Sequence, residues 1–165
     1  INALARLARE IWTEHYVGII GRAQVEYMLE KFQSISAIAA QIREGAEYYF
    51  IEHDEQPVGY VAVKDDPGSS MMFLSKIYVS SERRGIGLGK QALAFAEKLC
   101  LDHGARGLWL TVNRHNHKTI GWYEHMGFVK AAELVTDIGN GFVMDDYRME
   151  EKLGEAEIEL RDCRL

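Results

Sequence analysis

The chain of 165 residues has only two cysteines, two prolines and no long apolar run. Cys100 and Cys163 form no CxxC pair, so the sequence predicts neither a disulfide framework nor a cysteine metal site. No apolar segment approaches the roughly 18 residues that a membrane-spanning helix needs. The opening "INALARLARE" has the spacing of a helix interior and not of a signal peptide. We therefore expect a cytoplasmic protein with no membrane partner.

Basic residues are also in deficit. The chain has 19 Lys and Arg against 25 Asp and Glu, which gives a formal net charge of -6. Non-specific nucleic-acid binding needs a basic surface, so we expect no nucleic-acid partner. The acidic balance mildly favours a cationic small substrate. The composition, 47% hydrophobic and 27% charged, is that of an ordinary globular protein, and the length fits one domain.

Helical spacing dominates the N-terminal part of the chain. Residues 1–13 are predicted as a helix and residues 17–21 as a linker. A second helical region over 22–45 is predicted to break near Ser34, which can cap a new helix, and to end at Gly45.

Strand patterns follow Gly45. "EYYFIEH" and "VGYVAVK" are predicted as a hairpin, and "MMFLSKIYV" as the next strand. A helix over about 88–103 then leads to the apolar strand "GLWLTV" and a short helix that ends at Gly127. "FVKAAELVT" and "VMDDYRMEEKL" complete the pattern. This order predicts an α/β domain with a mixed sheet.

The stretch "SERRGIGLGK", residues 81–90, places three glycines at alternate positions. A P-loop would need glycine where Arg84 stands and Ser or Thr where Gln91 stands, so that interpretation fails. A dinucleotide-binding fold would begin with a strand and its glycine turn, whereas helices and a hairpin come first here. Backbone amides in such a turn suit a pyrophosphate. A tight turn with solvated basic side chains is the alternative.

The pattern Arg84-x-x-Gly87-x-Gly89 resembles the acetyl-CoA-binding signature of the GNAT superfamily of N-acetyltransferases. "LWLTVNRHNHKTIGWYEHMGF" resembles the family's next motif, at the expected distance and in the expected order. The resemblance covers about residues 48–153. It implies the GNAT fold, in which helices flank a central, mostly antiparallel sheet with two splayed parallel strands. A single domain over 1–165 would comprise acceptor-side helices (1–45), an acetyl-CoA-binding core (46–153) and a tail (154–165).

The resemblance implies acetyl-CoA as the cofactor. Its pyrophosphate would lie on the amides of the glycine stretch, and its pantetheine arm would bond to the backbone of the preceding strand. Asn113 and Asn116 match positions on the cofactor side of the site, and Asn116 is also a candidate helix N-cap. The predicted cofactor-binding residues are Ile77, Tyr78, Val79, Arg84, Gly85, Ile86, Gly87, Leu88, Gly89, Lys90, Asn113, Asn116 and Tyr123.

Acetyl transfer to an amine needs a neutral nucleophile, a donor for the developing oxyanion and a proton for the leaving thiolate. By resemblance, Tyr123 protonates the CoA sulfur, and a backbone N–H near Val79 is the oxyanion donor. A core packing role for Tyr123 is the alternative. His15, Glu26, Glu52 and Tyr78 all stay open as the general base.

The predicted acceptor is a primary amine, such as a polyamine or another small cationic amine. The predicted substrate-binding residues are Trp12, His15, Tyr27, Tyr78 and Asp145, since aromatic and acidic linings suit a cation. Helix packing and surface charge are their alternative roles. The last strands also resemble those of bacterial spermidine/spermine acetyltransferases. Protein or peptide acetylation, non-catalytic acyl-CoA binding and a homodimer all stay open, and no metal is predicted.

Overall fold

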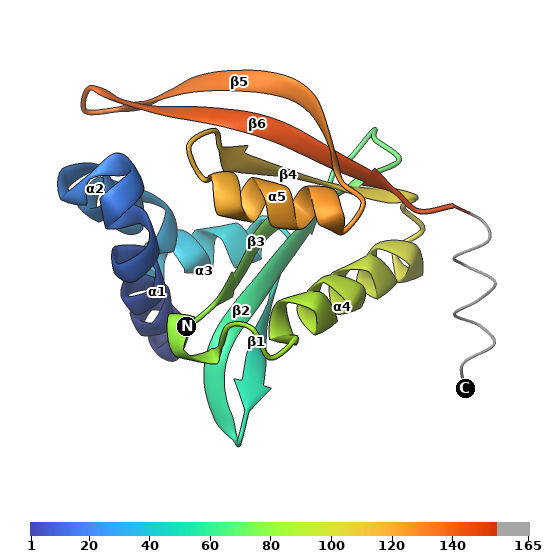
Figure 1. The fold of residues 1–165 in the computed structure, drawn as a ribbon, viewed down its shortest axis with the longest axis horizontal. Helices are drawn as coiled ribbons and strands as arrows, with labels where there is room; N and C mark the ends of the chain where they lie inside the picture. Colours follow the sequence, from blue (N-terminus) through green and yellow to red (C-terminus); the bar gives the residue numbers. More distant parts are fainter. Residues whose placement is uncertain (155–165) are drawn as a thin grey trace. The chain divides into compact units, whose positions relative to one another are not determined.

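The computed structural model describes residues 1–154, so Cys163 and nearly all of the predicted tail lie outside the described residues (Figure 1). Its six strands are ordered β1-β2-β3-β4-β6-β5 in one sheet. The β3–β4 pair is parallel, whereas β1–β2, β4–β6 and β5–β6 are antiparallel. The predicted mixed and mostly antiparallel sheet is therefore confirmed.

The chain divides into two compact units, and the division falls within β3 (Met72–Val79). The first unit combines Ile1–Lys64 with Ser75–Ala94. The second combines Asp65–Leu74 with the described residues from Phe95 onward. The single-domain assignment stays a prediction.

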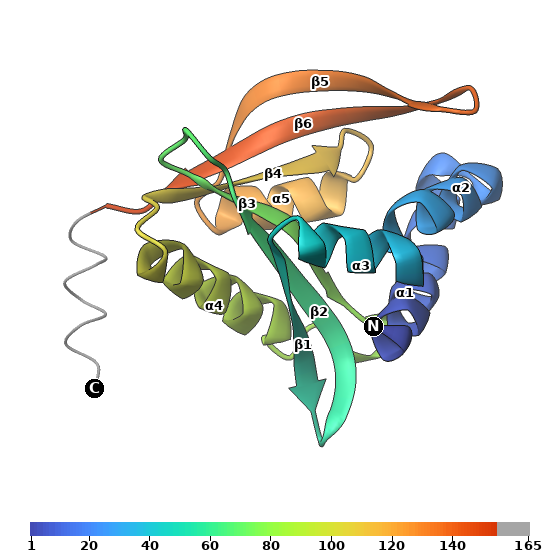
Figure 2. The ribbon, with the colours of Figure 1, turned by 180° about the vertical axis from the view of Figure 1, so that it is seen from behind.

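The first unit places three helices ahead of a hairpin. The helices are α1 (Asn2–Ile20), α2 (Arg22–Gln33) and α3 (Ile35–Arg43), and the hairpin strands are β1 (Ala46–His53) and β2 (Gln56–Asp65). Figures 1 and 2 show α1 and α2 packed side by side. The apolar face of α1 forms a core with α3 and β2, made of Leu4, Leu7, Ala8, Ile11, Ile38 and Tyr60.

The predicted linker over 17–21 is wrong, because α1 continues to Ile20 and only Gly21 breaks the helix, at φ 84°. A glycine inside a helix, such as Gly18, costs only about 1 kcal/mol, which the partial burial of this last turn offsets. The predicted break at Ser34 is confirmed, since its Oγ accepts the Ala37 N–H at 3.3 Å. Gly45, at φ 96°, follows the end of α3 as expected.

The second unit contains β4 (Gly107–Asn113), α5 (His117–His125), β5 (Val129–Gly139) and β6 (Phe142–Lys152). It also holds the start of β3 and the later part of α4 (Leu88–Asp102). Strand β4 is the apolar strand that the sequence predicts, and Leu108 and Leu110 in it are buried. Gly107 has no room for a side chain, because a Cβ there would lie 2.5 Å from the Glu151 carbonyl oxygen. None of the helices described is long and apolar enough to cross a membrane.

Candidate active site

The glycine stretch forms a turn that opens directly into helix α4. A short 3-10 turn, η1 (Ser81–Arg83), follows β3, and Gly85 and Gly87 then adopt φ angles of 83° and 88°. A Cβ on either would meet nothing within 4 Å, so the left-handed backbone, and not crowding, requires glycine at both positions. Gly89 lies in the first turn of α4 and is not among the glycines with a positive φ.

The helix that begins here presents positive charge at its N-terminus. The Gln91 N–H donates to the Gly87 carbonyl at 3.1 Å, so the amides before Gln91 are those that an α-helix leaves without an intrahelical acceptor. Arg84 and Lys90 are exposed beside them. The Arg84 Nε also donates to the Val79 carbonyl at 3.0 Å, which ties the loop to the end of β3. This donor set fits a phosphate or pyrophosphate.

Strand β3 leads into this loop and lies very close to β2. A Cβ on Gly59 would lie 2.3 Å from the Tyr78 carbonyl oxygen and 3.1 Å from the Val79 Cα. Just beyond the strand, the Ser80 N–H donates to the Val58 carbonyl at 2.8 Å. Gly59 therefore sets the backbone position at Tyr78 and Val79, a role that the sequence interpretation missed.

The Tyr78 ring forms an aromatic cluster with the rings of Trp12, Tyr16 and Tyr60. The Tyr78 ring centroid lies 5.6 Å from that of Trp12, 6.2 Å from that of Tyr16 and 5.5 Å from that of Tyr60. The hydroxyl oxygens of Tyr16 and Tyr78 lie 3.4 Å apart. Burial raises the pKa of Tyr60 well above its usual range.

Of the predicted substrate-binding residues, the structure brings Trp12, His15 and Tyr78 to this aromatic cluster. His15 stands edge-on to Tyr16, with the ring centroids 4.7 Å apart. Tyr27 is half-buried on α2, where the Lys31 ammonium lies 5.7 Å from its ring centroid.

Two of the four general-base candidates lie elsewhere in the first unit. Glu26 accepts from Arg9 at 2.7 Å, and Glu52 is exposed on β1. Of the other two candidates, Tyr78 belongs to the aromatic cluster, and His15 contacts the cluster through Tyr16.

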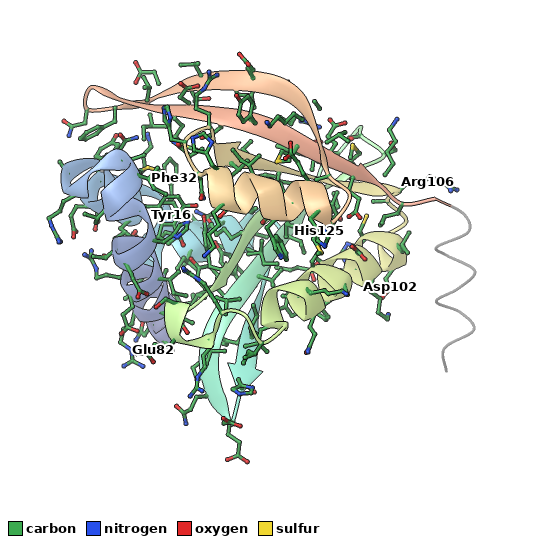
Figure 3. All side chains as sticks on the ribbon, viewed as in Figure 1. Tyr16, Phe32, Glu82, Asp102, Arg106 and His125 are labelled. Carbon is green, nitrogen blue, oxygen red and sulfur yellow. The ribbon has the colours of Figure 1, made fainter. Side chains whose placement is uncertain are left out.

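A buried lysine on β3 was not found from the sequence. Lys76 is only 8% exposed, and its Nζ donates to Gln41 Oε1 at 2.8 Å, to the Phe32 carbonyl at 3.4 Å and to the Tyr48 hydroxyl. Figure 3 labels Phe32 of α2, whose carbonyl is one of these acceptors, and Tyr16 of α1, which belongs to the aromatic cluster. Burial lowers the pKa of Lys76 to about 7 and raises that of Tyr48 to about 12. Lys76 thus joins α2, α3 and β1 to β3.

Helix α1 also contacts the turn that precedes the glycines. The Ser81 hydroxyl donates to the Glu14 carboxylate. Glu14 also lines an open hollow of about 550 Å³ on α1 and α2, together with Arg9, Glu10, Thr13 and Glu26. Three carboxylates and one guanidinium give this surface a negative charge.

In the second unit, Tyr123 and Asn116 are both buried, at 5% and 3% exposure. Tyr123 packs edge-on to the rings of Trp122 and Phe128, with centroids 5.0 and 5.2 Å away. Asn116 occupies the predicted N-cap position of α5, although its side chain makes no capping hydrogen bond. Asn113 Oδ1 accepts the His115 N–H at 2.9 Å and so shapes the turn before α5.

The carboxylate of Asp145 is already paired, because the Arg114 Nε lies 2.7 Å from its Oδ1. The Arg114 guanidinium therefore neutralises much of the negative charge with which Asp145 could attract a cationic amine. The neighbouring Asp146 is buried, and its pKa rises to about 6, chiefly through burial and also through the charge of Asp145. A hydrogen bond from Thr111 opposes this rise.

Cys100 is fully buried, and its Sγ donates to the Gly107 carbonyl at 3.1 Å. Burial raises the pKa of the thiol, which keeps it protonated at neutral pH. This residue is not placed to carry an acyl group.

Comparison with known proteins finds acetyltransferases among the matches. Residues 4–128 match the acetyltransferase (GNAT) family. An uncharacterized N-acetyltransferase of Lactobacillus delbrueckii subsp. lactis is 28% identical over 102 residues, which cover 58% of this chain and 59% of the relative. The 5-NmdU N-acetyltransferase of Pseudomonas phage PaMx11 is 29% identical over 82 residues, which cover 50% of this chain and 56% of the relative.

A solved structure agrees over nearly the whole chain. The PaiA N-acetyltransferase from Thermoplasma acidophilum, in complex with coenzyme A, superposes with a TM-score of 0.73 at 23% identity. The alignment covers 92% of this chain and 91% of that one. By contrast, the chain spans less than two thirds of the length of the two curated relatives, 59% and 56%. The likeness to the solved structure shows the GNAT fold, and with the family match over residues 4–128 it establishes that the chain belongs to the acetyltransferase (GNAT) family.

Proposed function

We propose that the protein transfers an acetyl group from acetyl-CoA to an amine. The observation that carries this proposal is the glycine turn of residues 84–90. Two left-handed glycines there lead directly into the N-terminus of α4, beside the exposed Arg84 and Lys90. Family membership supports the same conclusion, as does the coenzyme A bound to the similar protein from Thermoplasma acidophilum.

The proposed cofactor contacts are those that the sequence resemblance implies. Amides of 85–90 would hold the pyrophosphate, since the Arg84 N–H already donates to the Ser81 carbonyl at 3.2 Å. The backbone of Ile77, Tyr78 and Val79 would bond to the pantetheine arm. The close approach of Gly59 to β3 supports this, because it sets the β2 backbone directly against the backbone of Tyr78 and Val79. The resemblance also implies cofactor contacts for Asn113, Asn116 and Tyr123.

The proposed chemistry is direct transfer, to which the thioester contributes an activated acetyl group. The amine nitrogen bonds to the carbonyl carbon, and the carbon–sulfur bond breaks. The Val79 N–H would stabilise charge on the carbonyl oxygen, and the Tyr123 hydroxyl would give its proton to the departing sulfur. His15, or Tyr78 in its phenolate form, would accept the proton that the amine loses. The buried thiol of Cys100 supports transfer without an acyl-enzyme.

For the acceptor we propose a small cationic amine that approaches the aromatic cluster. Trp12, His15 and Tyr78 already lie together there, and aromatic faces attract ammonium groups. The carboxylates of the hollow on α1 and α2 add negative potential to the same unit. Asp145 contributes little to this proposal, because Arg114 pairs with it.

The test is a screen of CoA release from acetyl-CoA against polyamines, amino acids, aminoglycosides and peptides. We expect polyamines or similar small cations to react fastest. Rates with polyamines equal to those in buffer would reject the cationic acceptor, and faster reaction with peptides would favour peptide acetylation. Tight CoA binding with no turnover on any amine would instead indicate a binding protein.

A further inference from the structure

Strand β3 carries two side chains that hold the N-terminal helices, Lys76 and Tyr78. They are two residues apart, so they project from the same side of the strand. The Lys76 amine bonds to groups of α2, α3 and β1, whereas the Tyr78 ring contacts Trp12 and Tyr16 of α1. All of these residues belong to the first unit. Two residues from a candidate catalytic tyrosine, a buried amine can influence the reaction without touching the substrate.

The C-terminal end of α2 is held by the Lys76 amine. Because α2 ends at Gln33, the Phe32 carbonyl is among the last four, which accept no hydrogen bond from within the helix. Lys76 Nζ donates to this carbonyl at 3.4 Å, and Gln41 Nε2 donates to it at 3.0 Å. The negative end of the helix dipole also attracts an ammonium group. Lys76 therefore holds the last turn of α2 against β3.

Gln33, the next residue of α2, connects this contact to the aromatic cluster. It is only 3% exposed, and its Oε1 accepts a hydrogen bond from the Tyr60 hydroxyl at 3.4 Å. The Tyr60 ring is fully buried and its centroid lies 5.5 Å from that of Tyr78. Close-packed rings have little room to move separately, so a shift of Gln33 should move Tyr60 and, with it, Tyr78.

We propose that Lys76 is a positioning residue for the acceptor amine. By holding the end of α2, it fixes the place of the Tyr78 ring through the contact between Gln33 and Tyr60. The role rests on the proposed function, because it assumes that the amine approaches the aromatic cluster. Loss of the Lys76 amine loosens the Tyr78 ring and so weakens the binding of the acceptor.

The cofactor side of the first unit has attachments of its own. The Arg84 Nε donates to the Val79 carbonyl, and the Ser80 N–H donates to the Val58 carbonyl. Neither contact involves Lys76 or α2. Loss of the amine should therefore raise the KM for the acceptor and leave the Kd for CoA unchanged, a split that a general loss of structure would not produce.

The first test follows the Tyr78 ring without any substrate. In the full chain labelled with [13C]tyrosine, the ring resonance of Tyr78 is assigned by its loss in Y78F. We expect K76M to shift this resonance, and K64M to leave it in place, since the Lys64 side chain is 38% exposed on β2. An unshifted Tyr78 resonance in K76M would overturn the proposal.

A second substitution tests the connection through Gln33. Q33M removes the acceptor of the Tyr60 hydroxyl and should itself shift the Tyr78 resonance, so the proposal stays testable if K76M does not fold. In a Q33M background, K76M should shift the resonance much less than it does alone, because the connection is already broken. Equal shifts in both backgrounds would mean that Lys76 acts directly on its strand neighbour, which would overturn the proposed connection. Q24M, at a half-buried glutamine of the same helix, is the matched control and should leave the resonance in place.

The third test is kinetic and uses spermidine as the acceptor. K76M should raise the KM for spermidine about threefold, while calorimetry shows an unchanged Kd for CoA. An unchanged KM, or an equal weakening of CoA binding, would overturn the positioning role. No turnover of spermidine by the natural chain would instead reject the polyamine acceptor of the proposed function. In that case the resonance of Tyr78 would still decide whether Lys76 positions the ring.

Discussion

Replacing Lys76 by methionine removes a buried amine whose ionisation opposes folding at neutral pH. Burial lowers the pKa of Lys76 from 10.5 to about 7. At about 1.4 kcal/mol per pKa unit, protonation of Lys76 in the folded protein costs about 5 kcal/mol of stability at low pH. The unfolded chain binds this proton more tightly, so stability should rise as pH increases from about 7 towards 10.5.

The size of the effect follows from the same two pKa values. Between pH 7 and pH 9 the lysine should add about 2 kcal/mol to the free energy of unfolding of the natural chain. K76M lacks this gain. It also leaves Gln41 Oε1 and the Phe32 carbonyl without the Nζ donor, a loss that does not depend on pH in this range.

Urea unfolding at several pH values measures this contribution. The difference in unfolding free energy between the natural chain and K76M cancels other groups that titrate between pH 7 and pH 9. K64M is the control, since the Lys64 side chain is 38% exposed on β2, and its difference should stay flat. A flat difference for K76M as well would refute the inference that burial deprotonates Lys76.

Three further predictions concern the candidate active site. G87A should weaken CoA binding and lower the free energy of unfolding by about 1 kcal/mol, because alanine is strained at φ 88°. Calorimetry measures the binding and urea unfolding measures the stability, and unchanged values would argue against a required left-handed glycine. G59A should raise the KM for acetyl-CoA, because the new Cβ would lie only 2.3 Å from the Tyr78 carbonyl oxygen and would push it away. A normal KM in steady-state assays would mean that β2 and β3 adjust freely. Y123F should lower kcat by about 10²-fold with little change in the KM for acetyl-CoA, as expected when a general acid is lost. An unchanged kcat would remove Tyr123 from the mechanism.

The sequence predicted the features that depend on short segments of chain. Two glycine-containing motifs in the expected order identified the family, and hydrophobic periodicity located the strands and most helices. Local signals were enough for the cap at Ser34, because the hydroxyl and the amide that it accepts from are three residues apart. They were misleading at 17–21, where partial burial keeps α1 helical despite Gly18.

Features that depend on distant segments were missed. Alternation along β3 places Lys76 on the buried face with Met72 and Leu74, and this pattern could have marked it. Its acceptors, however, come from α2 and α3, 44 and 35 residues away in the sequence. Gly59 looks ordinary within its strand, and only the close approach of β3 explains it. Likewise, the pairing of Asp145 with Arg114 depends on two strands that meet only in the folded chain.

The most direct test of the central claim is amide hydrogen exchange of the protein with and without CoA. The account predicts that CoA slows exchange most strongly at the amides of residues 85–90, because the pyrophosphate accepts hydrogen bonds from them. The backbone of Ile77, Tyr78 and Val79 should show a second, weaker protection. No slowing at 85–90 under conditions where calorimetry shows CoA to be bound would contradict the assignment of this glycine turn as the pyrophosphate site.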